Sequence, residues 1–188
     1  VPDLSFTLDT QALMRYLAYQ YVPCPQTMFR EFQQLPPSSA MILEKGRLDI
    51  FTYWEAPASS SLVISEEEAC EELRRLMRRA VQRRMVADVP LGVFLSGGID
   101  SSIVTGLMAE CSPTPIQSFS IGFHEASYDE SSYARLVAKT FGTRHYEKVF
   151  LEEDCTDILP KIVSAMDVPM ADASAAPTWL LSKMTKEH

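Results

Sequence analysis

A short stretch rich in glycine and serine carries the residues of this sequence that are best suited to chemistry. An apolar run over residues 91–95 ends abruptly in Ser96-Gly97-Gly98, and a helix-favouring segment beginning with Asp100, Ser101 and Ser102 follows. This order predicts a strand, a tight loop and a helix N-terminus. Unpaired N–H groups at a helix start can bind phosphate, and adjacent glycines let a phosphate approach the backbone closely. The serines would add hydroxyl donors, and Asp100 would add a carboxylate for a magnesium ion that bridges protein and phosphate.

Two common nucleotide-binding patterns do not fit this loop. No lysine follows Gly98, as the Gly-x-x-x-x-Gly-Lys-Ser/Thr loop requires, and Gly97 and Gly98 are adjacent, unlike the glycines of Gly-x-Gly-x-x-Gly. An ordinary glycine-rich turn that opens a helix is the simpler alternative. The strand-like run before the loop and Asp100-Ser101-Ser102 after it favour a pyrophosphate-binding loop.

The loop resembles a known family motif. Residues 96–101, Ser-Gly-Gly-Ile-Asp-Ser, resemble the PP-loop of N-type ATP pyrophosphatases, and residues 87–92, Ala-Asp-Val-Pro-Leu-Gly, resemble the asparagine synthase family. The resemblance implies a ligase that binds ATP and Mg²⁺, adenylates a carboxylate, releases pyrophosphate and lets ammonia displace AMP. It implies catalytic roles for Ser96 and Asp100, with Asp100 also the metal ligand. The implied ATP-binding residues are Phe94, Leu95, Ser96, Gly97, Gly98, Asp100, Ser101, Ser102, Ile121 and Gly122.

The resemblance extends along nearly the whole chain. Residues 141–147 and 167–178 resemble later parts of the synthetase domain, and residues 1–61 resemble the end of a glutaminase-like region and a linker. Ser38-Ser39 departs from the family's usual Gly-His after the two prolines. The chain begins with Val1, not with a catalytic cysteine, so we expect these residues not to hydrolyse glutamine. A second phosphate loop and a catalytic lysine would follow His188 in the family, so residues 62–188 are expected to be the N-terminal part of a longer synthetase domain.

Hydrophobic periodicity and turn residues predict the elements that must position the loop. The first part is predicted to hold a helix within residues 4–22 with Asp9 or Thr10 as its N-cap, a short helix over 27–34, a β-hairpin over 40–54 that turns at Lys45-Gly46, and a linker over 55–61. The second part is predicted to hold a helix over 65–86 with a Ser65/Glu68 capping box, helices over 101–110, 130–141 and 152–166 and from 175 onward, and strands over 91–95, 116–123 and 144–150. We expect helix 101–110 to bury Ile103, Val104, Leu107 and Met108.

Strands that alternate with helices of this length imply an α/β fold with a parallel sheet and right-handed crossovers. We therefore expect a Rossmann-like PP-loop domain of the adenine nucleotide alpha hydrolase-like type, preceded by a small helix and hairpin segment. Ligands of such sheets bind beyond the carboxyl ends of the strands, which would place Ile121 and Gly122 beside the loop. A packing role is the alternative for Phe94 and Ile121, and His145 is expected to be structural.

Composition and charge indicate which classes of protein this sequence fits. The 188 residues are 46% apolar, the formal charge is −8, and the four scattered cysteines form no Cys-x-x-Cys pair. These features predict a cytoplasmic protein with neither a membrane span nor a nucleic-acid surface. An arginine-rich row over residues 74–84 is interpreted as a solvated helix face, because acidic residues lie within one turn of it.

The sequence therefore predicts an asparagine synthase that takes ATP, aspartate or a similar carboxylate, and ammonia from a glutaminase domain. A homodimer is a possible assembly. Other hypotheses stay open: a PP-loop amidotransferase or β-lactam synthetase with another carboxylate, a tRNA-modifying adenylating enzyme, which the acidic charge disfavours, and a non-catalytic nucleotide-binding module.

Overall fold

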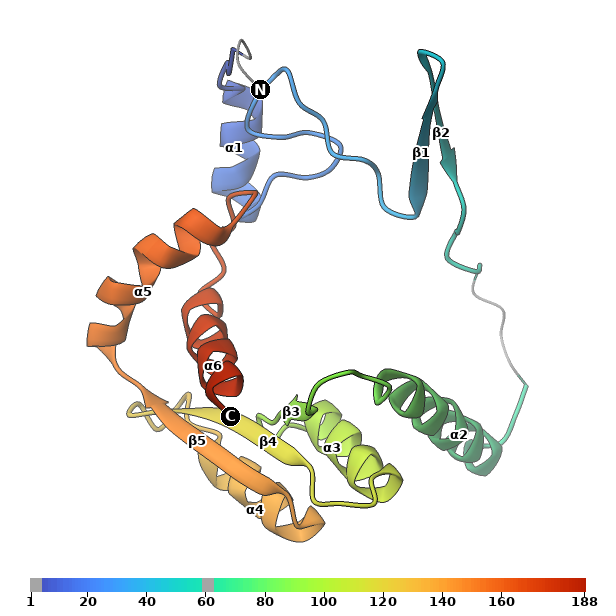
Figure 1. The fold of residues 1–188 in the computed structure, drawn as a ribbon, viewed down its shortest axis with the longest axis vertical. Coiled ribbons are helices and arrows are strands. Elements are labelled where there is room, and N and C mark those ends of the chain that lie inside the picture. Colours follow the sequence, from blue (N-terminus) through green and yellow to red (C-terminus); the bar gives the residue numbers. More distant parts are fainter. Residues whose placement is uncertain (1–4, 59–62) are drawn as a thin grey trace. The chain divides into compact units, whose positions relative to one another are not determined.

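The computed structural model describes residues 5–58 and 63–188, and Figure 1 shows their elements. The chain divides into two units, Val1–Ser61 with Val163–Ala173, and Leu62–Ile162 with Ser174–His188. In the first part of the chain the elements are α1 (Thr10–Tyr19), β1 (Ser39–Glu44) and β2 (Arg47–Thr52). They are followed by α2 (Glu66–Arg84), β3 (Gly92–Phe94), α3 (Ile99–Cys111), β4 (Gln117–Phe123), α4 (Ser131–Phe141), β5 (Arg144–Phe150), α5 (Glu152–Ala165) and α6 (Ala175–Glu187). The predicted linker over residues 55–61 lies partly outside the described residues.

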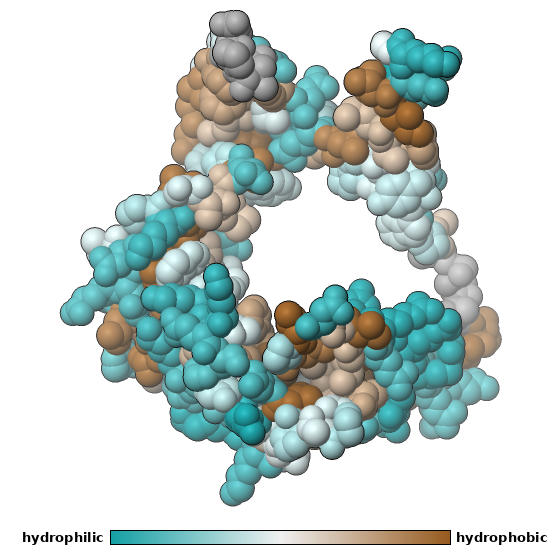
Figure 2. All heavy atoms as spheres, viewed as in Figure 1, coloured by the Kyte–Doolittle hydropathy of each residue, from teal (hydrophilic) through white to brown (hydrophobic). Residues whose placement is uncertain are grey.

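Local signals set the boundaries of the first elements. The Asp9 carboxylate accepts hydrogen bonds from the N–H groups of Gln11 at 2.9 Å and Ala12 at 3.4 Å. Asp9 is therefore the N-cap of α1, and Thr10, the other predicted candidate, is the first residue of the helix. The predicted hairpin is also confirmed, because β1 and β2 pair antiparallel around Lys45-Gly46. Its apolar side chains are exposed, with Leu43 at 70%, and Figure 2 shows hydrophobic colour along this segment.

The predicted helix over residues 27–34 is wrong, because this segment is irregular in the structure. The Thr27 hydroxyl donates to the carbonyl oxygens of Phe29 at 2.8 Å and Phe32 at 3.1 Å, and the Gln34 N–H donates to the Pro25 carbonyl at 2.8 Å. A threonine side chain that binds nearby backbone groups offers them an alternative to helical hydrogen bonds, and this competition explains the loop.

The second unit is built on a parallel sheet in the order β3-β4-β5, which confirms the predicted α/β class. Helices α3 and α4 make the two connections between its strands, and α4 and α6 lie on opposite faces of it (Figure 1). The faces differ in chemistry because strand residues alternate in direction. Phe119 and Tyr146 stack at 5.2 Å on the α6 side, whereas Ser118 and His145 are hydrogen-bonded on the α4 side.

Two apolar clusters hold this unit together. Val81 of α2 packs with Val93, Leu107, Met108 and Ile116, and a second cluster joins Leu95 to Ala134 and Ala138 of α4. The predicted burial of Leu107 and Met108 is confirmed. The predicted burial of Ile103 is wrong, because its side chain is 42% exposed.

Helix α2 begins with the predicted capping box, in which Ser65 and Glu68 each accept a hydrogen bond from the other's backbone N–H. Its arginine row is paired in part with acidic residues, Arg75 with Glu72 at 2.5 Å and Arg78 with Glu110. Within residues 5–58 and 63–188, no helix has the length and apolar character needed to cross a membrane.

Candidate functional site

The Ser96-Gly97-Gly98 loop leaves the carboxyl end of β3 and enters α3 directly. The Leu95 N–H donates to the Phe119 carbonyl at 2.8 Å, which extends the pairing with β4 by one residue before the chain turns. Gly97 has a φ of +88°, and a Cβ there would lie 2.6 Å from the backbone nitrogen of Ala134. Both the backbone angle and the approach of α4 therefore require glycine at this position.

The serine hydroxyls close the loop onto itself. Ser96 Oγ accepts the Gly98 N–H at 3.2 Å and lies 3.0 Å from Ser101 Oγ. Ser101 and Ser102 both donate to the Gly98 carbonyl, at 3.1 and 2.7 Å. These bonds hold the loop in one shape. Each serine hydroxyl has a single hydrogen, so Ser101 and Ser102 would donate to a ligand by turning that hydrogen away from the Gly98 carbonyl.

The start of α3 presents backbone donors beside this loop. The Ser102 N–H makes the first helical bond, to the Gly98 carbonyl at 3.0 Å, so the N–H groups of Ile99, Asp100 and Ser101 have no acceptor within the helix. The N-cap residue, Gly98, has no side chain to cover them. A Cβ on Gly98 would meet only Ser96 Oγ, at 3.3 Å. N–H groups without an acceptor in the helix, together with the positive end of the helix dipole, suit an anion such as a phosphate.

Asp100 lies in the first turn of α3 and is exposed. No group of three or more His, Cys, Asp or Glu side chains that could hold a metal ion occurs among the described residues. The donor set nevertheless fits Mg²⁺, because this ion binds in nucleotide sites through one or two carboxylates together with substrate phosphates and water.

The residues predicted to frame the nucleoside lie at the same end of the sheet. Phe94 is the last residue of β3 and is 45% exposed, and Ile121 and Gly122 are near the end of the neighbouring β4. Leu95 differs from the others, because its side chain is 1% exposed. Only the backbone of Leu95 is therefore available to a ligand.

Known proteins resemble this chain over nearly its whole length. The asparagine synthase family model matches residues 72–188. The chain belongs to the asparagine synthase family. It is 34% identical over 183 residues to a putative glutamine-hydrolysing asparagine synthetase of Methanocaldococcus jannaschii, covering 96% of this chain and 35% of that protein. It is 33% identical to glutamine-hydrolysing asparagine synthetase 1 of Bacillus subtilis, covering 96% of this chain and 28% of that protein.

A third relative carries a different name. The chain is 29% identical over 165 residues to the amidase chyE of Penicillium rubens, covering 78% of this chain and 25% of that protein. The chain thus spans about a third or less of the length of these curated relatives.

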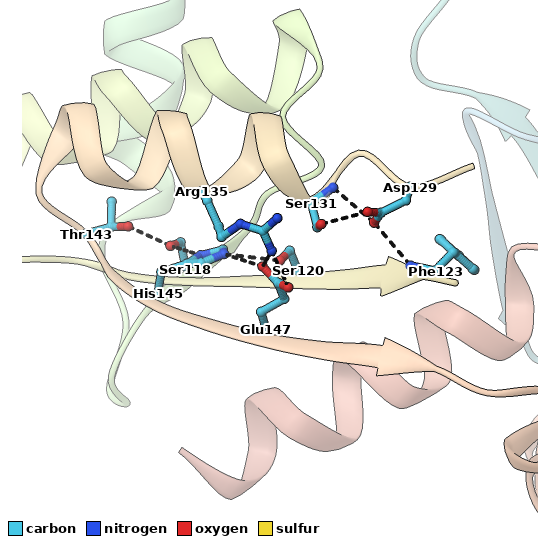
Figure 3. A network of polar contacts seen from close by, with 9 residues as sticks. All are labelled: Ser118, Ser120, Phe123, Asp129, Ser131, Arg135, Thr143, His145 and Glu147. Atoms are coloured by element: carbon cyan, nitrogen blue, oxygen red, sulfur yellow. Dashed lines mark hydrogen bonds and ion pairs between the residues drawn. The ribbon is translucent and has the colours of Figure 1, made fainter. Parts of the chain in front are cut away.

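Asp129 lies close to the predicted site, but the sequence alone did not indicate it as a site residue. Its carboxylate accepts hydrogen bonds from the N–H groups of Phe123 and Ser131, each at 3.2 Å, and from Ser131 Oγ at 2.9 Å (Figure 3). The Ser131 hydroxyl and then the Phe123 N–H hold the pKa of Asp129 below its ordinary value. The available signal was an aspartate two residues before a serine at a helix start, a common capping arrangement.

His145 lies in a polar network between the sheet and α4 (Figure 3). Its Nδ1 is 2.8 Å from Ser118 Oγ, and its Nε2 is 3.2 Å from Ser120 Oγ and 3.8 Å from a Glu147 oxygen. Burial lowers the pKa of His145, and the Glu147 charge opposes that shift.

These residue types match a Ser-His-acid triad, but their arrangement does not. Ser118 is fully buried, and Ser120 and Glu147 share the same ring nitrogen of His145, whereas a triad places serine and acid on opposite nitrogens. Arg135 of α4 binds Glu147 at 2.7 Å and joins the network to the helix. These contacts indicate a packing role for His145.

Proposed function

We propose that this chain provides the ATP-binding part of an enzyme that makes an amide from a carboxylate and ammonia. The observation that carries the proposal is the loop at Ser96-Gly97-Gly98, where a positive φ, a glycine backbone and the uncovered start of α3 meet at the end of a parallel strand. A loop that holds the β- and γ-phosphates leaves the α-phosphorus open to a nucleophile.

The proposed reaction has two steps. A carboxylate oxygen attacks the α-phosphorus, the bond between the α-phosphorus and the bridging oxygen breaks, and pyrophosphate leaves. Ammonia then attacks the acyl carbon, AMP leaves with its electron pair, and the nitrogen loses a proton to give the amide.

Each predicted site residue has a role in this scheme. The loop and helix residues Ser96, Gly97, Gly98, Ser101 and Ser102 hold the pyrophosphate portion of ATP, and Phe94, Ile121, Gly122 and the Leu95 backbone frame the nucleoside. Asp100 would bind Mg²⁺, which neutralises charge on the phosphates.

Aspartate is the carboxylate we favour, because the relatives from M. jannaschii and B. subtilis are called asparagine synthetases. The similarity to a protein called an amidase favours a second candidate, an amide-forming enzyme that takes another carboxylate. We further propose that residues 1–61 are the end of a glutaminase-like region and a linker, and that residues 62–188 are the N-terminal part of the synthetase domain. The glutaminase domain would supply the ammonia, and the protein would act in the cytoplasm.

Analysis of the nucleotide products tests the reaction class. The full-length protein, given ATP, Mg²⁺, ammonia and aspartate, should form AMP and pyrophosphate in equal amounts with asparagine. Formation of ADP and phosphate would contradict adenylation. ATP binding without turnover of any carboxylate would favour a non-catalytic nucleotide-binding module.

A further inference from the structure

We propose that Asp129 is a positioning residue for the nucleotide site, because it ties the carboxyl end of β4 to the first turn of α4, which in turn fixes Gly97. The identity of the ligand rests on the proposed function. The mechanical link from Asp129 to Gly97 rests on the contacts alone.

The first part of the link is the set of bonds that Asp129 accepts. Phe123 is the last residue of β4, and Ser131 is the first residue of α4, so one carboxylate joins the end of the strand to the start of the helix. Glu130, the N-cap residue of α4, makes no side-chain capping bond. Asp129 therefore supplies the capping acceptor at this helix start.

The second part of the link runs from α4 to the phosphate loop. The backbone of Ala134 and the Cβ of Tyr133 come so close to Gly97 that an added Cβ would lie 2.6 Å from each. Ala134 is fully buried and packs with Leu95, the residue just before the loop. Because this interface has no free space, a displacement of the first turns of α4 must displace or loosen the loop.

Asp129 also lies against the predicted nucleoside end of the site. A Cβ on Gly122 would lie 3.2 Å from Asp129 Oδ1 and 3.4 Å from Ser131 Cβ. The same carboxylate thus bounds the space beside Gly122 and secures the helix behind Gly97. These hydrogen bonds lower the pKa of Asp129, and bonds to a charged carboxylate are stronger than bonds to a neutral acceptor.

The test compares Asp129→Ala and Asp129→Asn with Glu130→Gln in the full-length protein. Glu130→Gln removes a neighbouring negative charge without removing a capping bond. Asp129→Ala should raise the KM for ATP by about 10-fold or more, because small misplacements of binding groups have large effects. Asp129→Asn keeps one carbonyl acceptor and should be intermediate, while Glu130→Gln should match the wild type. The KM for the carboxylate substrate should stay unchanged in all three variants.

A second readout needs no nucleotide. The backbone amide signals of Gly97 and Gly98 in NMR spectra should shift in Asp129→Ala and stay in place in Glu130→Gln. Unchanged Gly97 and Gly98 signals with an unchanged KM for ATP, in a folded Asp129→Ala or Asp129→Asn protein, would overturn the proposal. A wild-type protein that binds no ATP would instead refute the proposed function, and the amide signals would still decide the role of Asp129.

Discussion

Gly97 and Ala134 meet backbone to backbone, so that a Cβ on Gly97 would lie 2.6 Å from the Ala134 nitrogen. The two residues are 37 positions apart in the sequence and belong to the phosphate loop and to α4. Their contact makes the shape of the loop depend on a helix that contributes none of the predicted ligand-binding side chains.

Gly97→Ala tests this contact. At a positive φ the added Cβ costs about 1–2 kcal/mol, and overlap with α4 should add about 1–3 kcal/mol. Gly142→Ala is the matched control, because Gly142 also has a positive φ, of +64°, but a Cβ there meets nothing within 4 Å. Urea unfolding should show a larger loss of stability for Gly97→Ala, and ATP binding should weaken only in that variant. Equal losses in both variants would contradict the close contact.

Asp100→Ala tests the proposed magnesium ligand. We expect carboxylate-dependent pyrophosphate release to fall about 100-fold or more, because charge on the phosphates would lose its stabilisation. The melting temperature should change little, since Asp100 is exposed. An unchanged rate of pyrophosphate release at saturating Mg²⁺ would contradict the role of Asp100 as a magnesium ligand.

Ser65→Ala tests the start of α2. Loss of the Ser65 side chain removes the bond to the Glu68 N–H and should lower the free energy of unfolding by about 1 kcal/mol. The KM for ATP should not change, because this cap is not part of the phosphate loop. Thermal unfolding and steady-state kinetics measure the two effects separately, and an altered KM for ATP would show that α2 acts on the site.

His145 should make stability depend on pH. Burial lowers its pKa in the folded protein, while Glu147 of β5 and Arg135 of α4 act on it in opposite directions. Between this lowered pKa and the unfolded value of about 6.5, the unfolded state binds more protons. The contribution of His145 to the free energy of unfolding should therefore be fully present above pH 6.5. It should be lost as the pH falls from 6.5 to the lowered pKa. His145→Gln should remove this pH dependence of stability. The control His124→Gln, on an exposed loop, should keep it. A pH profile of His145→Gln that matches the wild type would contradict this role of His145.

Local sequence signals predicted much of the fold. Asp9 and the Ser65/Glu68 pair each mark a helix start through side-chain bonds to backbone N–H groups a few residues away. The strand at Arg144–Phe150 was predicted with the bounds that the structure has. The alternation of strands and helices then implied the parallel sheet.

Features that depend on how a loop closes or how two elements pack were missed. The helix predicted over 27–34 failed because Thr27 binds nearby carbonyl groups instead of leaving them to a helix. The contact of Gly97 with Ala134 joins residues that are separated by the whole connection through β4. Asp129 was overlooked because its partners lie on both sides of it in the chain and become one cluster only after the loop folds.

The central claim is that this chain belongs to an enzyme that adenylates a carboxylate, and ATP–pyrophosphate exchange tests it most directly. The full-length protein, with ATP, Mg²⁺ and labelled pyrophosphate, should incorporate label into ATP only when a carboxylate substrate is added, and aspartate should support the exchange. Exchange with a different acid would support adenylation of a carboxylate but would show that the substrate is not aspartate. No exchange with any carboxylate, from a folded protein that binds ATP, would contradict the account.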